Sequence, residues 1–287
     1  MPSRTIPLIF KRKSLHQLFG AYQSSFKGSG LIFSESRPYT SGDPYHRIDR
    51  LTTAKKQDIY LKQFEEERLL RVLLVVTGGE SMHFASTTPT KRDMIQTLAQ
   101  LFFESVLTNG DQIGHLLMDG QTQYWHRPAR QAQQIAFFTQ HFGSISFGGK
   151  SPSASQIASF IQKHHLHHHL ILWISDTPVR ADEQILHAIA TKNDLLYLQL
   201  FDPFERTWVR PDEGVEVFSL QNDTTTASYR DDPWSRQRYQ ETIDAQITET
   251  RRLLNSRGIT YHTAMTTDDP FATLVQLFET HSRMHSR

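Results

Sequence analysis

The sequence predicts an α/β fold, in which an open, doubly wound and mostly parallel sheet is flanked by helices. One observation behind this prediction is a set of short, almost wholly aliphatic runs, such as LLRVLLVV at residues 69–76. Such runs are typical of strands that are buried on both faces, as the strands of a parallel sheet are. The other observation is that these runs alternate with amphipathic stretches of helical spacing, which indicates right-handed βαβ units. At 287 residues, the chain is long enough to bury a core of this kind.

The first elements of the core follow in order. Residues 91–107 space their apolar side chains as a helix does, and an Asn-Gly pair ends that helix. Residues 112–118 are predicted to form the next strand. The pair Asp119-Gly120 is typical of a hairpin turn, so residues 121–125 should return antiparallel beside that strand.

The rest of the core repeats the alternation. Helices are expected at 132–142, 154–162, 183–190, 235–255 and 271–279, and strands at 170–174, 195–201 and 259–264. Residues 20–64 do not follow the pattern, because they are rich in glycine, serine and tyrosine and contain only short alternating segments. We interpret them as loops and short strands that lie across the main sheet. The expected division is an N-terminal extension, 1–68, packed on an α/β domain, 69–287.

Composition excludes several classes of protein. Lysine and arginine number 31 against 30 acidic residues, and a net charge of +1 does not favour a nucleic-acid partner. The chain has no cysteine, which excludes disulfides, thiolate metal sites and cysteine catalysis. No apolar run approaches the ~20 residues that span a bilayer, and residues 1–13 do not resemble a signal peptide. We therefore expect a cytoplasmic protein without a membrane span.

Two motifs suggest ligands, but the residues around them favour other interpretations. GSISFGGKS at 143–151 has five residues between its first glycine and Gly-Lys-Ser, where a phosphate-binding loop has four, and Pro152 follows at once. Five histidines between His164 and His169 lie in a predicted turn with no carboxylate among them. We interpret this run as a solvated turn, with metal binding as the alternative. No serine-hydrolase or zinc-protease motif is present, so we expect no enzyme.

The carboxyl ends of two predicted strands carry the candidate site. Ligands of open α/β sheets bind in the crevice beyond such ends. The segment TGGES, which ends at Ser81, follows the first core strand, and Asp176 comes at the end of strand 170–174. If the two strands are neighbours, Ser81, Asp176 and a hydroxyl from Ser151 or Ser153 converge on one point. Those oxygens would suit a hard cation such as Mg²⁺.

The N-terminal part of the chain carries a signature of polar residues and glycines. Its positions are Gly28, Gly30, Phe33, Glu35, Arg37, Tyr39, Gly42, Asp43, Arg47, Ile48, Asp49, Phe64 and Glu67. In order and spacing it resembles the bacterial family called domain of unknown function fifty-eight. Further matches, at Lys91, Asp111, Asp176, Asp202 and Glu205, extend the resemblance over essentially the whole chain. Arg50 and Lys55 depart from the family, which has tryptophan and arginine at those positions.

The resemblance implies a von Willebrand factor A-like fold and a role in protein interaction. Members of the family are usually encoded beside MoxR-type AAA+ ATPases. The resemblance therefore implies an adaptor that serves such an ATPase and its client protein and has no catalysis of its own. The fold often carries a metal-ion-dependent adhesion site, made of Asp-x-Ser-x-Ser, a threonine and a second aspartate.

This chain departs from the adhesion-site pattern. The corresponding positions are Thr77 for the first aspartate, Gly79 for the first serine, Ser81 for the second, Ser151 or Ser153 for the threonine, and Asp176 for the second aspartate. The loss of one carboxylate weakens the hold on a divalent cation. We therefore expect no resident metal or other cofactor, and we expect Thr77, Ser81 and Asp176 to hydrogen-bond one another. A Mg²⁺- or Mn²⁺-dependent adhesion module is the alternative, and a hydrolase that uses Asp176 is a third hypothesis.

The signature block also has a physical interpretation. Its glycines permit tight turns where a Cβ would clash. Its charged residues, Arg37, Asp43, Arg47 and Asp49, lie in a region with little apolar surface to bury. We expect them to form an ion-pair network that clamps the extension to the sheet, with a role at an interface as the second interpretation.

Overall fold

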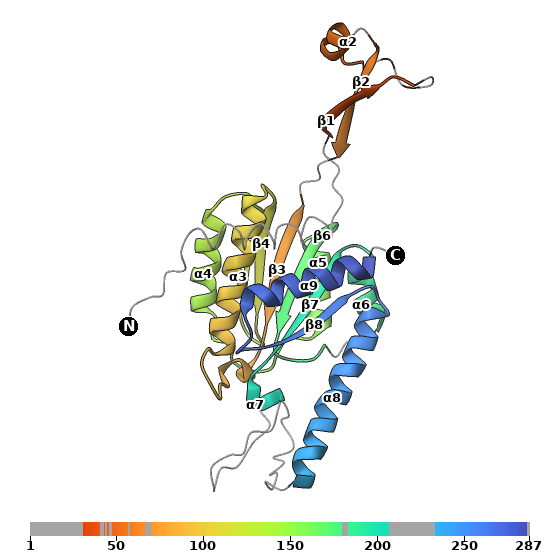
Figure 1. The fold of residues 1–287 in the computed structure, drawn as a ribbon. Coiled ribbons are helices and arrows are strands. Elements are labelled where there is room, and N and C mark those ends of the chain that lie inside the picture. Colours follow the sequence, from red (N-terminus) through yellow and green to blue (C-terminus); the bar gives the residue numbers. More distant parts are fainter. Residues whose placement is uncertain are drawn as a thin grey trace. The chain divides into compact units, whose positions relative to one another are not determined.

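The structure is a computed structural model, and it describes residues 31–40, 43, 45, 48–56, 58–66, 70–179, 183–206 and 233–285. These residues fall into two compact units, a small one within Phe26–Leu70 and a large one that begins at Arg71 (Figure 1). The packing of residues 1–68 on the core stays a prediction.

A six-stranded sheet forms the centre of the large unit. Its strands, in spatial order, are β5 (Gln123–Ala129), β4 (Gln112–Met118), β3 (Arg71–Thr77), β6 (His169–Ser175), β7 (Asp194–Phe201) and β8 (Thr260–Met265). All neighbouring strands are parallel except β5, which runs antiparallel to β4. Every residue of β3 after Arg71 is buried, as its aliphatic composition requires. The predicted α/β class is confirmed.

Helices cover both faces of this sheet. They are α3 (Lys91–Thr108), α4 (Gln133–Ser144), α5 (Ala154–Lys163), α6 (Glu183–Ala190), α8 (Pro233–Asn255) and α9 (Pro270–His285), while the short helix α7 (Pro203–Arg206) follows the end of β7 and buries no residue. On one face, α5, α6 and α8 bury apolar side chains in a cluster with Val75 and Trp173 of the sheet. On the face nearer the viewer in Figure 1, α3 packs against α9 through the stacked rings of Phe102 and Phe278. Within the described part of the chain, no helix is both long and apolar enough to cross a bilayer.

Local signals in the sequence place most helix ends where they are predicted. α3 begins at a capping box formed by Thr90 and Asp93, and α5 begins at one formed by Ser153 and Gln156. Gly110 follows α3 with φ of 81°, a left-handed backbone that the Asn-Gly pair predicts. Strand β5 extends further than expected, because an edge strand is partly exposed on both faces and lacks a clear apolar pattern.

The small unit holds a two-stranded antiparallel sheet, made of β1 (Leu31–Pro38) and β2 (Tyr60–Glu66), and the helix α2 (Arg50–Lys56). The sequence predicts the short strands but not the helix, because α2 buries none of its residues and therefore has no amphipathic pattern. Its first turn is held by a single carboxylate, that of Asp49.

Asp49 caps α2. Its carboxylate accepts hydrogen bonds from the hydroxyls of Ser36, at 2.6 Å, and Thr52, at 2.7 Å, and from the backbone N–H groups of Leu51 and Thr52. The hydrogen bonds from Ser36 and Thr52 lower the pKa of Asp49 to about 2. The described partners of Asp49 are thus hydroxyl and amide groups, where an ion pair is expected from the sequence.

One pair of the expected ion-pair network is present in the described part of the small unit. Arg37 donates to both carboxylate oxygens of Asp43, at 2.7 and 2.8 Å, and this contact lowers the pKa of Asp43. Because both residues belong to the small unit, this pair braces the unit internally and does not clamp it to the main sheet. Tyr39 stacks on Tyr45, with ring centroids 5.8 Å apart. The remaining signature positions in the predicted set, Gly28, Gly30, Gly42, Arg47 and Glu67, lie outside the described residues.

Candidate binding site at the carboxyl ends of the central strands

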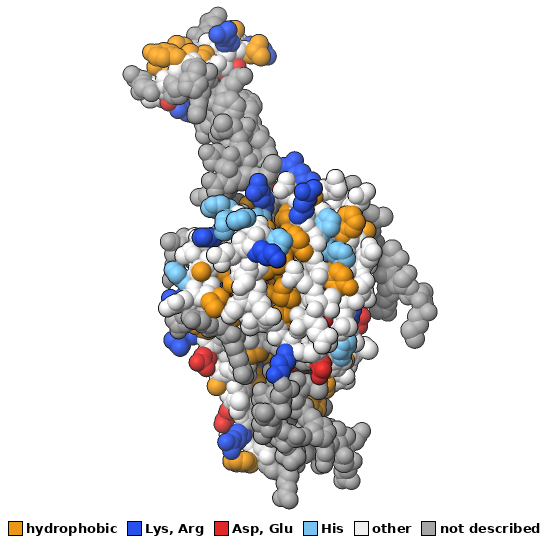
Figure 2. All heavy atoms as spheres, turned by 180° about the vertical axis from the view of Figure 1, so that it is seen from behind, with side chains coloured by type: hydrophobic (Ala, Val, Ile, Leu, Met, Phe, Trp, Pro, Cys, Tyr) orange, Lys and Arg blue, Asp and Glu red, His pale blue; other side chains and the backbone are white. Residues whose placement is uncertain are grey.

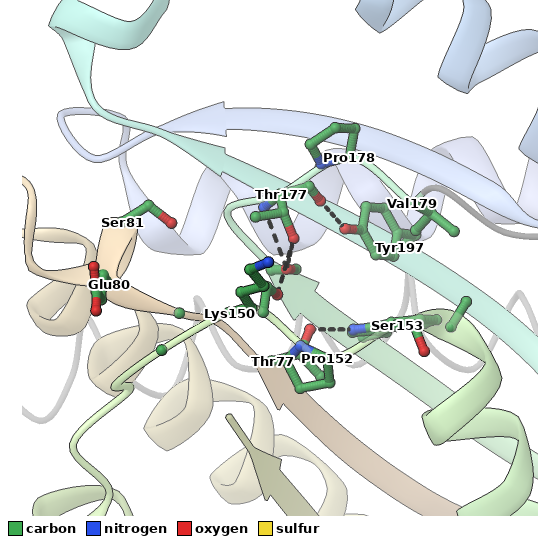
Figure 3. Close-up of a pocket in the computed structure, with 16 residues that line it drawn as sticks. Thr77, Glu80, Ser81, Lys150, Pro152, Ser153, Thr177, Pro178, Val179 and Tyr197 are labelled. Atoms are coloured by element: carbon green, nitrogen blue, oxygen red, sulfur yellow. Dashed lines mark hydrogen bonds between the residues drawn. The ribbon is translucent and has the colours of Figure 1, made fainter. Parts of the chain in front are cut away.

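A pocket lies where the sequence predicts a site. Strands β3 and β6 are neighbours, with Thr77 opposite Ser175, so their carboxyl ends meet at one edge of the sheet. A pocket of about 510 Å³ opens at this edge (Figure 3). Five of the six expected adhesion-site positions line it, namely Thr77, Gly79, Ser81, Ser151 and Ser153. Asp176 is not among the described lining residues and lies in a separate cluster of charges.

Glycines allow two walls of the pocket to approach each other. The 3-10 helix η2 (Glu80–His83) follows β3, and the backbone N–H of Glu80 donates to the carbonyl of Gly149 at 3.0 Å. A Cβ atom on Gly79 would lie 2.5 Å from that carbonyl oxygen, and Gly149 itself has φ of 75°. Gly79 and Gly149 therefore permit a close passage of the backbone at 149–151 past η2.

Three hydroxyls form a chain across the pocket. The hydroxyl of Thr177 lies 3.1 Å from the hydroxyl of Ser151 and 3.1 Å from that of Ser175. The Tyr197 hydroxyl donates to the carbonyl of Thr177 (Figure 3), and burial raises the pKa of Tyr197, which keeps the phenol protonated as a donor. Sequence reasoning does not find Tyr197, because its position beside this loop depends on the register of β7 with β6.

The other expected positions have partners of different kinds. The indole N–H of Trp173 donates to the hydroxyl of Thr77 at 2.8 Å, and both side chains are buried. Ser153 caps α5, as described above. Ser81 is a buried residue whose side chain lines the pocket, and its hydroxyl has no hydrogen bond to another residue that the structure describes. The expectation that Thr77, Ser81 and Asp176 bond one another is wrong, because nearer partners from α3 and β6 take two of the three.

Lys91, the first residue of α3, takes Asp176 as a partner. Its ammonium is fully buried and donates to Asp176 Oδ2 at 3.2 Å, to Glu205 Oε1 at 2.6 Å and to the backbone carbonyl of Ser81 at 3.0 Å. The three N–H groups of the ammonium thus each have an acceptor. This cluster joins the start of α3, the turn η2, the loop after β6 and the helix α7.

Glu205 is itself fixed by the turn that carries it. Its second oxygen, Oε2, accepts the backbone N–H of Asp202 at 2.8 Å. Burial raises the pKa of Glu205, and the charge of Lys91 opposes that rise. Asp202, which is fully buried, accepts the backbone N–H and the hydroxyl of Ser86. The loops after β3 and β7 are tied together in this way.

The residues at this edge do not fit a resident divalent cation, which the fold suggested by the resemblance often carries. The two carboxylates that could hold such an ion, Asp176 and Glu205, both contact the ammonium of Lys91, and the hydroxyl of Thr77 is bound to Trp173. A second cation at this point would be repelled by the ammonium. In the described parts of the chain, no three histidine or acidic side chains are grouped so that they could hold a metal ion.

The histidine run is only partly a solvated turn. His164 ends α5 and stacks on Phe160, with ring centroids 4.2 Å apart. His165 and His168 both have positive φ, at 51° and 59°, and His169 is buried at the start of β6. The histidines of the run therefore lie in different environments, from the end of α5 to the buried start of β6.

Comparison with known proteins finds relatives that match this chain over nearly its whole length. The uncharacterized proteins Mb1516 of Mycobacterium bovis and MT1527 and Rv1480 of Mycobacterium tuberculosis are each 24% identical to this chain over 284 residues, which is 98% of this chain and 89% of theirs.

Solved structures with a similar fold include two proteins of low sequence identity. The VWA (von Willebrand factor A) domain of SpRpn10 is 11% identical, with a TM-score of 0.43, and the match covers 72% of this chain and 94% of that one. The conserved hypothetical protein BatB from Bacteroides thetaiotaomicron is 14% identical, with a TM-score of 0.46, over 76% of this chain and 100% of that one.

A family match covers most of the chain. The family described as "Protein of unknown function DUF58" matches residues 35–249, about three quarters of the 287 residues. The match begins inside the small unit and extends to α8, so it includes every loop that forms the pocket and the Lys91 cluster. The chain belongs to the DUF58 family.

Proposed function

We propose that this chain is a non-enzymatic interaction module that works with a MoxR-type AAA+ ATPase on a client protein. The observation that carries the non-enzymatic part of the proposal is the bonding of the polar groups at the carboxyl edge of the sheet, whereas the ATPase partner comes from what membership of the family implies. The hydroxyl of Thr177 bonds to those of Ser151 and Ser175, and the carboxylates of Asp176 and Glu205 bond to Lys91. Nucleophilic catalysis needs a hydroxyl beside a base, and histidine, the commonest general base, is not among the described residues that line the pocket, whose charged members are Glu80 and Lys150.

The same bonding suits a preformed binding surface. Glu80 is tied to Gly149, Ser151 to Thr177, and Ser86 to Asp202, so the loops around the edge hold one another in place. Loops that are already ordered lose little conformational entropy when a partner binds. This favours recognition of a partner by a rigid edge over a reaction that needs moving groups.

The small unit offers exposed apolar side chains beside cations. Tyr45, Leu51 and Ile59 are 74%, 76% and 47% exposed, and Lys55 and Lys56 lie in the last turn of α2. Figure 2 shows hydrophobic and cationic side chains at the surface of this unit. Large exposed apolar side chains with neighbouring cations fit a protein partner that presents apolar and acidic groups. The expected cytoplasmic location accords with such a partner and remains a prediction.

Affinity purification from the chain's own cell, followed by mass spectrometry, tests the proposal. The tagged chain should recover an AAA+ ATPase, with a yield that differs between ATP-bound and nucleotide-free conditions. The double variant Tyr45→Ser/Leu51→Ser should lower that yield at least tenfold, whereas Gln276→Ser, at an exposed position of α9, should leave it unchanged.

Two results would contradict the proposal. One is the absence of an AAA+ ATPase from the recovered proteins under both nucleotide conditions. The other is hydrolysis of ester or phosphoester probes by the purified chain that Asp176→Asn abolishes, because an activity of that kind would make the edge of the sheet a catalytic site.

A further inference from the structure

Two carboxylates, one buried and one partly exposed, face one cation at the carboxyl edge of the sheet. Asp176 is 3% exposed and follows β6, while the side chain of Glu205 is 24% exposed and comes from α7, after β7. Each contacts the ammonium of Lys91, which is fully buried. A buried carboxylate such as that of Asp176 needs a partner of opposite charge, because desolvation of the ionised form is costly.

The atoms around the ammonium are the ones that a hard metal ion prefers. They are one oxygen from each of the two carboxylates and the backbone carbonyl oxygen of Ser81, at 3.2, 2.6 and 3.0 Å. Divalent cations such as Mg²⁺ are held in proteins by carboxylate and carbonyl oxygens of this kind. A fourth oxygen, Asp176 Oδ1, is buried and has no hydrogen-bond partner among the described residues.

The ammonium of Lys91 also holds residues that form the walls of the pocket. Ser81 gives its carbonyl to Lys91 while its side chain lines the pocket. Asp176 lies between Ser175 and Thr177, whose hydroxyls belong to the chain across the pocket. A cation at this position therefore holds two walls of the pocket, whichever cation it is.

From this geometry we infer that Lys91 is a built-in replacement for a divalent cation. The side chain reaches from the first turn of α3 and supplies the positive charge that would otherwise have to be bound from solution. The chain needs no metal to order this edge, and removal of the ammonium leaves an oxygen cage in which Mg²⁺ or Mn²⁺ binds. Lys91 is thus a positioning residue for the pocket.

The variant Lys91→Ala tests the inference through metal-dependent stability. Thermal unfolding and calorimetric titration are measured with EDTA, with 5 mM Mg²⁺ and with 5 mM Mn²⁺. The unmodified chain should show no stabilisation by either ion. Lys91→Ala should unfold at a lower temperature in EDTA, and Mn²⁺ should restore several degrees, with one ion bound per chain, because an ion that binds only the folded state stabilises it.

Two further variants separate this site from other metal-binding groups. In Lys91→Ala/Asp176→Asn, the cage loses a carboxylate, so the response to Mn²⁺ should fall at least tenfold in affinity, even though the histidines near His164 are unchanged. The triple variant Lys91→Met/Asp176→Asn/Glu205→Gln carries no charge at the site. It should fold in EDTA and ignore both ions. If Lys91→Ala does not fold in EDTA, refolding with Mn²⁺ is the measurement, and recovery of folded chain is the expected result.

Several results would overturn the inference. They are saturable binding of Mn²⁺ to the unmodified chain that Asp176→Asn abolishes, a Lys91→Ala variant as stable in EDTA as the unmodified chain, and failure of Mn²⁺ to stabilise or refold Lys91→Ala. Every readout uses the isolated chain, so the inference does not depend on the partner proposed above.

Discussion

The ammonium of Lys91 lies 2.6 Å from the Oε1 atom of Glu205, although the two residues are 114 positions apart in the sequence. Lys91 begins α3 on one side of the sheet edge, and Glu205 belongs to α7, which follows β7. The same ammonium also contacts Asp176, which follows the carboxyl end of β6. Lys91, the first residue of α3, is thus the central residue of a polar network that joins Ser81, Asp176 and Glu205 next to the pocket.

Loss of Glu205 should therefore destabilise the large unit. Glu205→Ala removes a charge-assisted hydrogen bond from Lys91 and the acceptor of the Asp202 N–H, so the free energy of unfolding should fall by about 2 kcal/mol. Asp244→Ala is the matched control, because it breaks an equally short but exposed pair with Arg206 and should have little effect. Urea unfolding followed by circular dichroism measures both. Equal effects of the two variants would contradict the role given to burial.

Gly79 should tolerate no Cβ atom. In Gly79→Ala, the new carbon would lie 2.5 Å from the carbonyl oxygen of Gly149 and 2.8 Å from the amide of Ser151, so the loop must move. The expected cost is about 1–3 kcal/mol, as for other cases of overpacking. Gly143→Ala is the control, because nothing lies within 4 Å of its Cβ position. Thermal unfolding distinguishes the two, and a Gly79→Ala chain that unfolds at the same temperature as Gly143→Ala would refute the close passage.

Stability should decrease in mild acid because of His115. This imidazole is buried on β4 and burial, with the nearby His141 and His126, lowers its pKa to about 3. In the unfolded chain it protonates near its ordinary pKa of 6.5. Between these two values the unfolded state binds the extra proton, so the stability contributed at neutral pH is lost as pH falls, by up to about 1.4 kcal/mol per pH unit.

The variant His115→Phe checks this origin of the pH dependence. A phenyl ring fits beside Phe103 and Phe138, which already contact the imidazole, and it does not titrate. Urea unfolding at pH 7.5, 6 and 5 should show a shallower decline than in the unmodified chain. Some decline should remain, because burial lowers the pKa of His281 to about 3 as well. An unchanged slope would rule out His115 as a contributor.

Asp49 should be needed for α2. Asp49→Ala removes the acceptor of the Leu51 and Thr52 N–H groups, so amide hydrogen exchange in residues 50–56 should become faster. Because hydrogen bonds lower the pKa of Asp49 to about 2, the cap is present above its ordinary pKa of 3.8 and is lost as pH falls through 2. Asp58→Ala, at an exposed position before β2, is the control and should leave the exchange unchanged. Equal exchange in both variants would contradict the cap.

Much of the fold follows from patterns that are local in the sequence. The aliphatic run of β3 predicts a strand buried on both faces, and the pairs Asn109-Gly110 and Asp119-Gly120 predict the turns that follow α3 and β4. The position of the pocket also follows, because the carboxyl ends of parallel strands meet at one edge. Helix α2 cannot be predicted from such patterns, since it buries no residue and its capping residue, Asp49, is held by a hydrogen bond from Ser36 of β1.

Which side chains bond to one another within the site cannot be predicted from these local patterns. Thr77 is bound by Trp173 across 96 positions, Asp176 by Lys91 across 85, and neither pair has a signal that links its members in one sequence. Burial and periodicity act within a few residues and so establish which segments are strands, helices and turns. Which polar side chains contact each other depends on the order and register of the strands, and these are set by the packing of the whole sheet. The ammonium of Lys91 and the indole of Trp173 therefore take the positions of the partners that residue types alone suggest.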